Sequence, residues 1–428
     1  MSLAEGIAYA KAHQPAVLAG IARVAASKQA AKVPRAQWLP QLGATAQLFG
    51  ATANNSTALY VTEDDLDIPR IGGTPSGGSN WQPRASTFVG AGARQEIFDF
   101  GRIAAEAAAT DEAVEVERQR SANALLDVTY GVEEAYFAVQ AAKAVLQAAN
   151  DAYARSKTHR DLAKSGVDSG MRPPIELTRA EADLAKFNAG RIRAQGGLMQ
   201  AQAVFAAAVG VTDPALDATP TATAPPDLPS LDDAIAEAGK RDPRVLDALA
   251  EIRVEEERTR AIGAEMRPNV YATGTISGRA GGVAATTGGV PSGDGWIPNV
   301  PNWDIGLVLS WPLFDPVVVA RKDASRAAEE VRRQELAQTR FSEVASIRQA
   351  YVSVEVARSA LPALEQEVAA GRANFAQADA RFRAGLGTAV ELADAEAVLA
   401  DAEIQLALGI FEVARTRAVF GRTIAEGI

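Results

Sequence analysis

The chain has no cysteine and only two histidines, His13 and His159, among its 428 residues. Without cysteine there is no disulfide framework, no thiolate nucleophile and no cysteine-ligated zinc site. Two histidines also leave a Ser-His-Asp triad or a multi-histidine metal site close to excluded. Cysteine chemistry and multi-histidine metal sites are therefore not expected in this chain.

Aromatic residues, a basic excess and long hydrophobic runs are also scarce. Aromatics are 6% of the chain although hydrophobic residues are 47%, so alanine and small aliphatic residues carry the apolar content. Against 53 Asp and Glu residues there are 43 Lys and Arg residues, and the net charge of −10 argues against a nucleic-acid partner. No stretch approaches the roughly 18 consecutive apolar residues of a spanning helix, which excludes a helical inner-membrane protein. The N-terminus has no basic segment followed by an apolar one, which is compatible with an exported, processed chain.

The chain repeats itself. A shift of 228 residues aligns the segment Ser2–Thr45 with Ser230–Thr273 without a gap and pairs Pro15 with Pro243. Further along, the shift shortens to 215, where Ala180-Glu181-Ala182 answers Ala395-Glu396-Ala397. We predict a first repeat over residues 1–210, a linker over 211–229 that is rich in Pro, Thr and Asp, and a second repeat over 230–428.

Each repeat has the pattern helix, strand, loop, strand, long helix, turn, helix. The first helix is expected from about Leu3 to Trp38, and the strands at about 41–49, 87–98, 268–278 and 302–311. The first loop carries the acids Glu63, Asp64, Asp65 and Asp67, interpreted as a solvated external loop. In the last strand the large apolar residues share one face, opposite Asp304, Gly306 and Ser310: Trp303, Ile305, Leu307, Leu309 and Trp311.

These strands fit a membrane crossing. A tilted spanning strand needs roughly 9–11 residues, and Trp303 and Trp311 lie near the strand ends, as interfacial aromatic residues do. Four strands cannot close a barrel, so their edges need identical strands from other subunits. The five apolar residues of the last strand are therefore predicted to face the membrane.

The helices that follow the strands are unusually long. No proline occurs from Gly101 to about Lys164, which allows a helix on the order of 95 Å. Apolar residues recur at alternating steps of three and four, which predicts coiled-coil packing: Leu125, Val128, Val132, Ala135, Val139, Ala142 and Leu146, then Ile347, Ala350, Val354, Ala357 and Leu361, and then Leu392, Ala395, Leu399, Ala402 and Leu406. Asp99 and Asp315 are expected to cap the long helices. The two histidines have no partner pattern and are interpreted as ordinary helix residues.

At this point the sequence resembles the TolC family of outer-membrane efflux and secretion channels, over essentially the whole chain. The resemblance rests on the duplicated element order and on local motifs, namely Ser2-Leu3-Ala4-Glu5, Leu39-Pro40 and Ile97-Phe98-Asp99-Phe100-Gly101-Arg102. The second repeat has Trp311-Pro312-Leu313-Phe314-Asp315 at the last of these, with Pro316 in place of the glycine. The resemblance implies an α+β membrane protein and a homotrimer. Its twelve-stranded β-barrel, four strands per chain, would continue as a long periplasmic α-helical barrel.

The family also implies where passage is controlled. Glu391 and Asp394 fall on its acidic positions after the second tip glycine, and Glu176 matches the first-repeat position, so these acids are candidates for a cation-selective periplasmic gate. The tip turns would meet a periplasmic adaptor protein through Gly170, Met171, Arg172, Gly385, Leu386, Gly387 and Thr388. The prototype channel has an arginine where Gly387 stands, so the same latch is not expected here.

The resulting hypothesis is a passive outer-membrane exit duct, with a periplasmic extension, in a Gram-negative-type bacterium. A conduit needs no catalytic residue, so this hypothesis implies a protein that is not an enzyme and has no catalytic residue, metal site or cofactor. It would release small molecules, drugs or other toxic compounds, pumped by an inner-membrane transporter through the adaptor, and it would contact outer-membrane lipid but no nucleic acid. Within transport, the alternative is the exit duct of a type I protein secretion system. The alternative from another class is a soluble periplasmic coiled-coil adaptor or scaffold, although we find no lipoyl-like β domain.

Overall fold

A computed structural model describes residues 1–52, 83–220, 228–281 and 300–427. The predicted acidic loop around Glu63 lies outside the described residues. The chain forms two compact units, and each is built from segments that are not contiguous in the sequence. The first comprises Met1–Ala25, Glu115–Ala250 and Arg333–Ile428, and the second comprises Ala26–Val114 and Glu251–Arg332.

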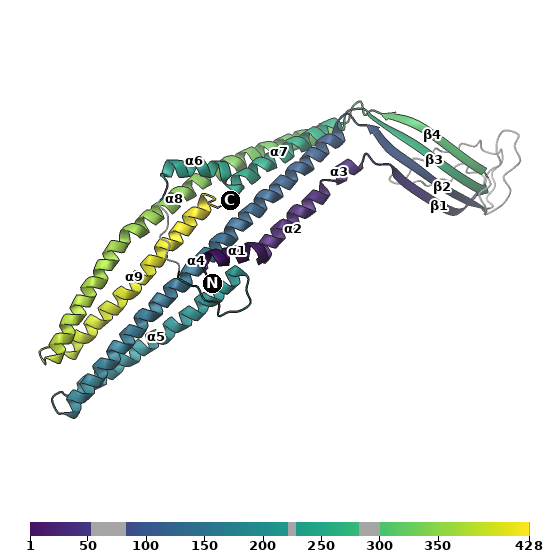
Figure 1. Cartoon of the computed structure of the whole chain (residues 1–428). Helices are drawn as coiled ribbons and strands as arrows, with labels where there is room; N and C mark the ends of the chain where they lie inside the picture. Colours follow the sequence, from purple (N-terminus) through teal and green to yellow (C-terminus); the bar gives the residue numbers. More distant parts are fainter. Residues whose placement is uncertain (53–82, 221–227, 282–299, 428) are drawn as a thin grey trace, which may run out of the picture. The chain divides into compact units, whose positions relative to one another are not determined.

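Helices make up the first unit and part of the second. Their order is α1 (Leu3–His13), α2 (Pro15–Ala30), α3 (Val33–Ala36), α4 (Arg102–Asp168), α5 (Pro174–Val209), α6 (Leu231–Arg241), α7 (Pro243–Ala264), α8 (Pro316–Arg383) and α9 (Ala389–Thr423). In the first unit, α4 and α5 form one antiparallel hairpin and α8 and α9 form another (Figure 1). The two long helices are confirmed, and α8 continues through Pro362.

The prediction of one helix from Leu3 to Trp38 was wrong, because prolines divide this segment into α1, α2 and α3. Gln14 is extended (φ −65°, ψ 124°), as expected for a residue before proline, and Pro15 then starts α2. The second repeat breaks in the same way at Asp242 (φ −60°, ψ 116°), before Pro243.

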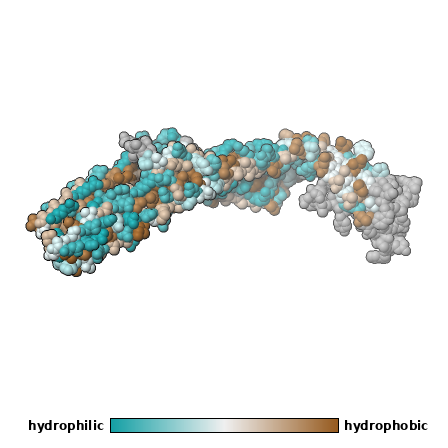
Figure 2. Space-filling view, turned by 60° about the horizontal axis from the view of Figure 1, so that its bottom comes forward, coloured by the Kyte–Doolittle hydropathy of each residue, from teal (hydrophilic) through white to brown (hydrophobic). Residues whose placement is uncertain are grey.

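Most residues of the predicted helical seams are buried, others such as Leu125, Leu361 and Leu406 are half-buried, and the duplication extends to the packing. Val132, Val139, Ile347 and Val354 have no exposed surface. In the first repeat Tyr136 meets Phe205 edge-on with ring centroids 5.9 Å apart, and in the second, 215 residues later, Tyr351 meets Phe420 at 5.8 Å. On the face seen in Figure 2, hydrophilic and hydrophobic residues alternate along the helices. The duplication in sequence is therefore a duplication of the core.

Four antiparallel strands form a sheet in the second unit, in the order β1-β2-β3-β4. They are β1 (Gln41–Thr52), β2 (Pro83–Phe98), β3 (Asn269–Gly281) and β4 (Val300–Ser310). The predicted strands are confirmed, with ends that differ by a few residues. Ala44 pairs with Ala91, Ala91 with Ile276 and Ile276 with Trp303, so one row of side chains crosses the whole sheet on one face.

The two faces of this sheet differ in chemistry. Trp303 is 77% exposed and Leu307 74% exposed, and Ile305 and Leu309 lie on the same face. On the opposite face Tyr271, Thr275 and Ser277 are buried, and the Thr275 hydroxyl donates a hydrogen bond to the Asp304 carboxylate. The apolar face is thus the open one in the single chain.

Both long helices begin at an aspartate that caps them, as predicted. The Asp99 carboxylate accepts hydrogen bonds from the backbone N–H groups of Gly101 (3.0 Å) and Ile103 (2.5 Å). Asp315 accepts from the N–H of Val317 at 2.8 Å. Each carboxylate therefore satisfies amide groups that have no partner within the first helical turn.

Candidate functional site at the helical tips

The two helical hairpins end in turns with the same backbone. Gly170 and Gly385 have φ of +71° and +73°, the left-handed conformation that glycine adopts readily at the end of a helix. After the first, the N–H of Met171 donates to the carbonyl of Gly166 at 2.9 Å, and after the second, the N–H of Leu386 donates to Arg381 at 2.9 Å. The turns match residue for residue at a shift of 215.

The matched residues at the two turn apices are apolar and open. Met171 is 80% exposed and Leu386 is 75% exposed. The two turns therefore present a large apolar side chain at the same position.

The predicted gate acids have different surroundings. Glu391 accepts the backbone N–H of Thr388 at 3.3 Å, while the Thr388 hydroxyl accepts the N–H of Glu391 at 3.2 Å. This capping box starts α9, and its Thr-x-x-Glu signal was readable in the sequence but missed. Asp394 is exposed one turn further on. Glu176 forms an ion pair with Arg172 at 2.7 Å.

Arg172 also contacts the other hairpin. Its Nη2 donates to the carbonyl of Phe382, near the end of α8, at 2.7 Å. Its guanidinium lies 3.7 Å from the centroid of the buried Phe382 ring. One side chain of the first predicted tip turn thus contacts the end of α8, just before the second predicted tip turn.

A buried cluster of ionisable side chains on α4, α8 and α9 was not anticipated. Glu396 on α9 is 2% exposed, and it contacts His159 Nδ1 at 3.0 Å and Arg155 Nε at 3.6 Å, both on α4. His159 Nε2 lies 3.6 Å from Asp379 on α8, so the interpretation of His159 as an ordinary helix residue was wrong. A signal existed, because Glu396 lies four residues after Leu392 and three before Leu399, on the apolar face where a carboxylate needs a partner.

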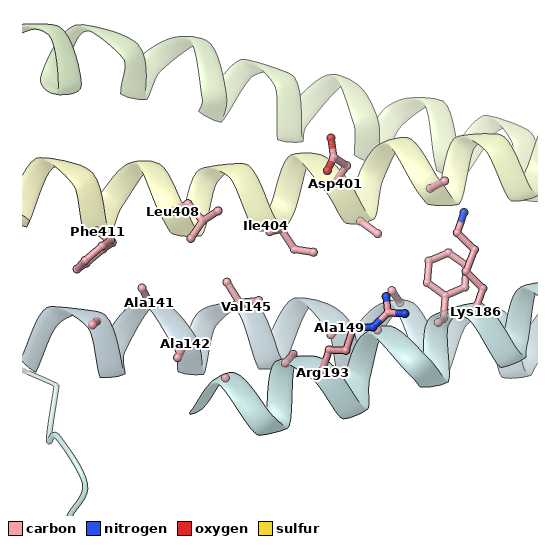
Figure 3. A pocket seen from close by; sticks show the side chains of 18 residues that line it. Ala141, Ala142, Val145, Ala149, Lys186, Arg193, Asp401, Ile404, Leu408 and Phe411 are labelled. Atoms are coloured by element: carbon pink, nitrogen blue, oxygen red, sulfur yellow. The ribbon is translucent and has the colours of Figure 1, made fainter. Parts of the chain in front are cut away.

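Elsewhere in the first unit a groove of about 740 Å³ lies between α4, α5 and α9 (Figure 3). Its lining is mainly Ala, Gly and aliphatic residues, with Lys186 and Arg193 on α5 and Asp401 on α9. Among the described residues, no group of three or more His, Asp and Glu side chains is arranged to hold a metal ion.

Along the described ranges of the chain, none of the helices combines the length and the apolar character needed to cross a membrane.

The chain has two helical hairpins with matched tip turns, and a four-stranded sheet whose strands lie between helices in a duplicated order. Together these features define the class of outer-membrane channel chains. The family described as "Outer membrane efflux protein" matches residues 7–211 and 234–416. The chain belongs to this family. It is an outer-membrane efflux channel with a periplasmic helical extension, which agrees with the expectation that it is not an enzyme and sets aside the soluble scaffold.

Solved structures support the fold. The outer-membrane channel OprN is 20% identical, with a TM-score of 0.76 over 99% of this chain and 90% of its own. VceC from Vibrio cholerae is 17% identical, with a TM-score of 0.76 over 99% and 96% of the two chains. The open state of the MtrE channel of Neisseria gonorrhoeae is 18% identical, with a TM-score of 0.74 over 99% and 89%. The comparison with curated proteins finds no match.

Proposed function

We propose that three copies of this chain close one twelve-stranded barrel in the outer membrane and form the exit duct of a tripartite efflux system. The observation that carries this proposal is the sheet. One face carries large exposed apolar residues, and the order β1-β2-β3-β4 leaves β1 and β4 as edge strands of the described sheet. In a membrane an open edge is costly because its N–H and C=O groups lack partners, so neighbouring copies must supply the next strands. Trp303, Ile305, Leu307, Leu309 and Trp311 then face lipid.

The tips are the periplasmic end of this duct. Threefold symmetry brings the carboxylates of Glu391 and Asp394 around one axis, where they favour cations and form the gate. Glu176 is paired with Arg172 at 2.7 Å, whereas Arg381 approaches Glu391 only to 4.0 Å. The turns Gly170–Arg172 and Gly385–Thr388, with Met171 and Leu386 exposed, are the contact surface for a periplasmic adaptor. An inner-membrane transporter loads small molecules into the duct.

The test of assembly uses the absence of cysteine from these 428 residues. Ala44→Cys in β1 is combined in turn with Trp303→Cys, Ile305→Cys and Leu307→Cys in β4, and disulfides are formed by mild oxidation in outer membranes. At least one combination should give a ladder that ends at three chains, because a closed ring has no free edge. The control pairs Ala44→Cys with Ala91→Cys, which are partners within one chain and should give only monomers. A ladder that continues beyond three chains, or monomers in every combination, would contradict the proposal.

The test of the gate is the double variant Glu391→Gln with Asp394→Asn. Glutamine keeps the capping box, so the variant removes charge without removing the helix start. Single channels in planar bilayers should lose cation selectivity and be blocked less by divalent cations from the periplasmic side. Asp232→Asn with Glu237→Gln on α6 removes the same charge away from the tips and should change neither property. If selectivity and block survive in the tip variant, the constriction lies elsewhere.

A further inference from the structure

A basic pocket lies in the second unit, where α4, α7 and α8 meet the sheet (Figure 1). It has a volume of about 590 Å³, and its lining includes four cationic side chains and one carboxylate, namely Arg260, Arg267, Lys322, Arg326 and Glu257. We propose that Arg267 and Lys322 bind the phosphate of an anionic phospholipid in the periplasmic leaflet of the outer membrane. This site rests on the proposed function, because it requires the sheet to lie in that membrane.

Only two of the four cations in the pocket have a carboxylate partner. Arg260 forms an ion pair with Glu257 at 2.5 Å, and Arg326 lies 3.7 Å from Asp323. The two proposed phosphate ligands form no ion pair with any of the described residues. Positive charges without a counter-charge repel one another in a shared pocket, so an anion that binds there relieves this repulsion.

Two neighbouring cations outside the pocket are paired. Arg321, next to Lys322 on α8, forms an ion pair with Glu265 at 2.8 Å. Arg35 on α3 forms an ion pair with Asp111 at 2.5 Å. The lack of carboxylate partners is therefore not a general property of the cations in this region, and it occurs in a chain whose net charge is −10. Such a local excess of positive charge indicates a specific anion site rather than a generally basic surface.

The pocket lies at the end of the apolar face of the sheet. Phe98 pairs with Val270 and Val270 with Leu309, so these three residues form the last row of that face. The Phe98 ring meets the Phe100 ring edge-on with centroids 4.6 Å apart, and Arg267 Nη1 donates to the Phe100 carbonyl at 2.7 Å. A continuous set of contacts thus links the apolar face to the pocket.

The position of Arg267 along the chain corresponds to the depth of lipid headgroups. It is two residues before Asn269, where β3 begins, which is about 7 Å of extended chain. The headgroup region on each side of a bilayer is roughly 5–8 Å thick, since a hydrocarbon core of about 30 Å lies within a membrane of about 40–45 Å. With Trp311 at the edge of the hydrocarbon, as expected for an interfacial aromatic residue, Arg267 lies among the phosphates.

The Lys322 side chain reaches the pocket because of its helix and a nearby glycine. Side chains on a helix lean toward its N-terminus, and α8 begins at Pro316, close to the end of the sheet, so Lys322 leans toward the sheet. It passes over Gly263 on α7, where an added Cβ would lie 3.3 Å from Lys322 Nζ. The ammonium group supplies a compact charge and the Arg267 guanidinium a planar set of donors, and both kinds of group bind phosphate in proteins.

An anionic phospholipid suits this site better than a soluble phosphate or a zwitterionic lipid. Its acyl chains can lie on the apolar face of the sheet while its phosphate occupies the pocket, so that one molecule covers both surfaces. A zwitterionic headgroup would bring a further cation close to Arg260 and Arg326, which the positive charge of the pocket disfavours. Basic pockets at membrane surfaces bind anionic headgroups in this way.

The test is native mass spectrometry of the purified protein in a non-ionic detergent, with palmitoyl-oleoyl phosphatidylglycerol as the probe. The unmodified chain should bind this lipid more tightly than palmitoyl-oleoyl phosphatidylcholine. The pocket variant combines Arg267→Gln with Lys322→Gln. Its affinity for phosphatidylglycerol should fall about thirtyfold, at roughly a factor of five for each cation at a membrane surface. Equal affinity of the unmodified chain for the two lipids would overturn the anionic site.

The matched control combines Arg35→Gln with Arg321→Gln. It removes the same charge near the same end of the sheet, but from side chains that already have carboxylate partners. Its affinity for phosphatidylglycerol should match that of the unmodified chain. An equal loss in the control would indicate diffuse attraction of the lipid to the protein surface and would overturn the pocket.

A single variant separates binding from folding. Lys322 forms no hydrogen bond or ion pair with the described residues, so Lys322→Gln removes no polar contact of the fold. Its thermal unfolding midpoint without added lipid should match that of the unmodified chain, while its affinity for phosphatidylglycerol falls about fivefold. Unchanged affinity would overturn the role of Lys322 in the site.

Two further readouts identify the source of the phosphate and the state of assembly. Inorganic phosphate at a few millimolar should not displace phosphatidylglycerol, and displacement would mean that the pocket binds a soluble anion, which overturns the lipid proposal. The same spectra count the chains in each assembly. A count other than three would contradict the proposed trimer, whereas the amount of lipid bound per chain would still decide on the pocket.

Discussion

The sheet buries polar residues, whereas the first compact unit, here called the helical unit, buries apolar residues between its helices. In the sheet, large apolar side chains such as Leu307 are exposed while Thr275 and Ser277 are buried on the other face. In the helical unit, Leu399, Ile347 and Val354 are buried in seams between helices. The same residue type therefore has a different role in each unit. A leucine in a seam holds helices together, whereas a leucine on the sheet face is placed for contact with something outside the chain.

The difference lies in the period of the pattern rather than in composition. Steps of three and four bring apolar residues to one side of a helix, where a second helix covers them. A step of two brings them to one side of a strand, and the described sheet has no second layer on that side. A surface of this kind is stable only against lipid or another apolar partner.

The largest effect on stability is expected from a substitution in a buried seam between helices. Leu399 is 3% exposed and packs over Gly371, where an added Cβ would be 3.6 Å from Leu399 Cδ1. Leu399→Ala should destabilise the helical unit by about 2–5 kcal/mol, because it removes apolar contact and leaves a cavity. Urea unfolding followed by circular dichroism at the helical band measures this loss.

Two controls accompany that variant. Leu408→Ala on the same helix changes a side chain that is 43% exposed and should cost much less. Leu307→Ala on the sheet should cost on the order of 0.5 kcal/mol, since lipid contact with a single leucine contributes little. Equal losses at Leu399 and Leu307 would mean that the two units do not differ in what they bury.

A charge on the sheet should give the next largest effect. If Leu307 is near the bilayer midplane, Leu307→Arg should cost about 2–4 kcal/mol of the stability of the membrane-inserted protein. Ser310→Arg, on the opposite face, should be tolerated much better. The fraction of heat-modifiable, folded protein in outer membranes measures both. Similar tolerance at the two positions would show that this face does not contact lipid.

Much of this contrast could be predicted from the sequence. The shift of 215 residues, the seam spacing and the alternation around Trp303 all depend on local periodicity, which survives without knowledge of the fold. The helix breaks at Pro15 and Pro243 were also local, but the apolar pattern on either side masked them. Gly170 and Gly385 were assigned to the tip turns by the family resemblance, and both are left-handed in the structure, where glycine carries no steric penalty.

The contacts between hairpins could not be predicted in the same way. Arg172 and Phe382 are 210 residues apart and His159 and Glu396 are 237 apart, so which side chains meet depends on how two hairpins pack. The sequence places Arg172 at a tip, but not against a carbonyl of the other turn. Glu396 could have been flagged as a carboxylate on an apolar face, although its partners on α4 and α8 come only from the structure.

The smallest effects are expected from two carboxylates of the helical unit, Glu343 and Glu412, whose pKa values differ from the ordinary value in opposite directions. Burial raises the pKa of Glu343, and the nearby Asp242 adds to the rise. Among the described residues its Oε1 has no hydrogen-bond partner. On α9, the hydrogen bonds from Arg415 lower the pKa of Glu412 below its usual range. Ionised Glu343 therefore destabilises the fold, whereas ionised Glu412 stabilises it.

The two carboxylates should respond to pH with opposite signs. Ionised Glu343 lowers the free energy of unfolding above its raised pKa, and this loss is absent below the ordinary pKa of 4.5. Glu343→Gln should therefore stabilise the protein near pH 7, and the gain in stability should disappear as the pH falls to about 4.5. The contribution of Glu412 is present above 4.5 and is lost as pH falls through its lowered pKa, so Glu412→Gln should destabilise near pH 7 and become neutral only in stronger acid. Each difference should be below about 1 kcal/mol, because solvent screens part of the interaction. Unfolding midpoints of both variants between about pH 7.5 and pH 3 measure the effect. Shifts of the same sign near neutral pH would show that burial does not govern these acids as it governs the leucines.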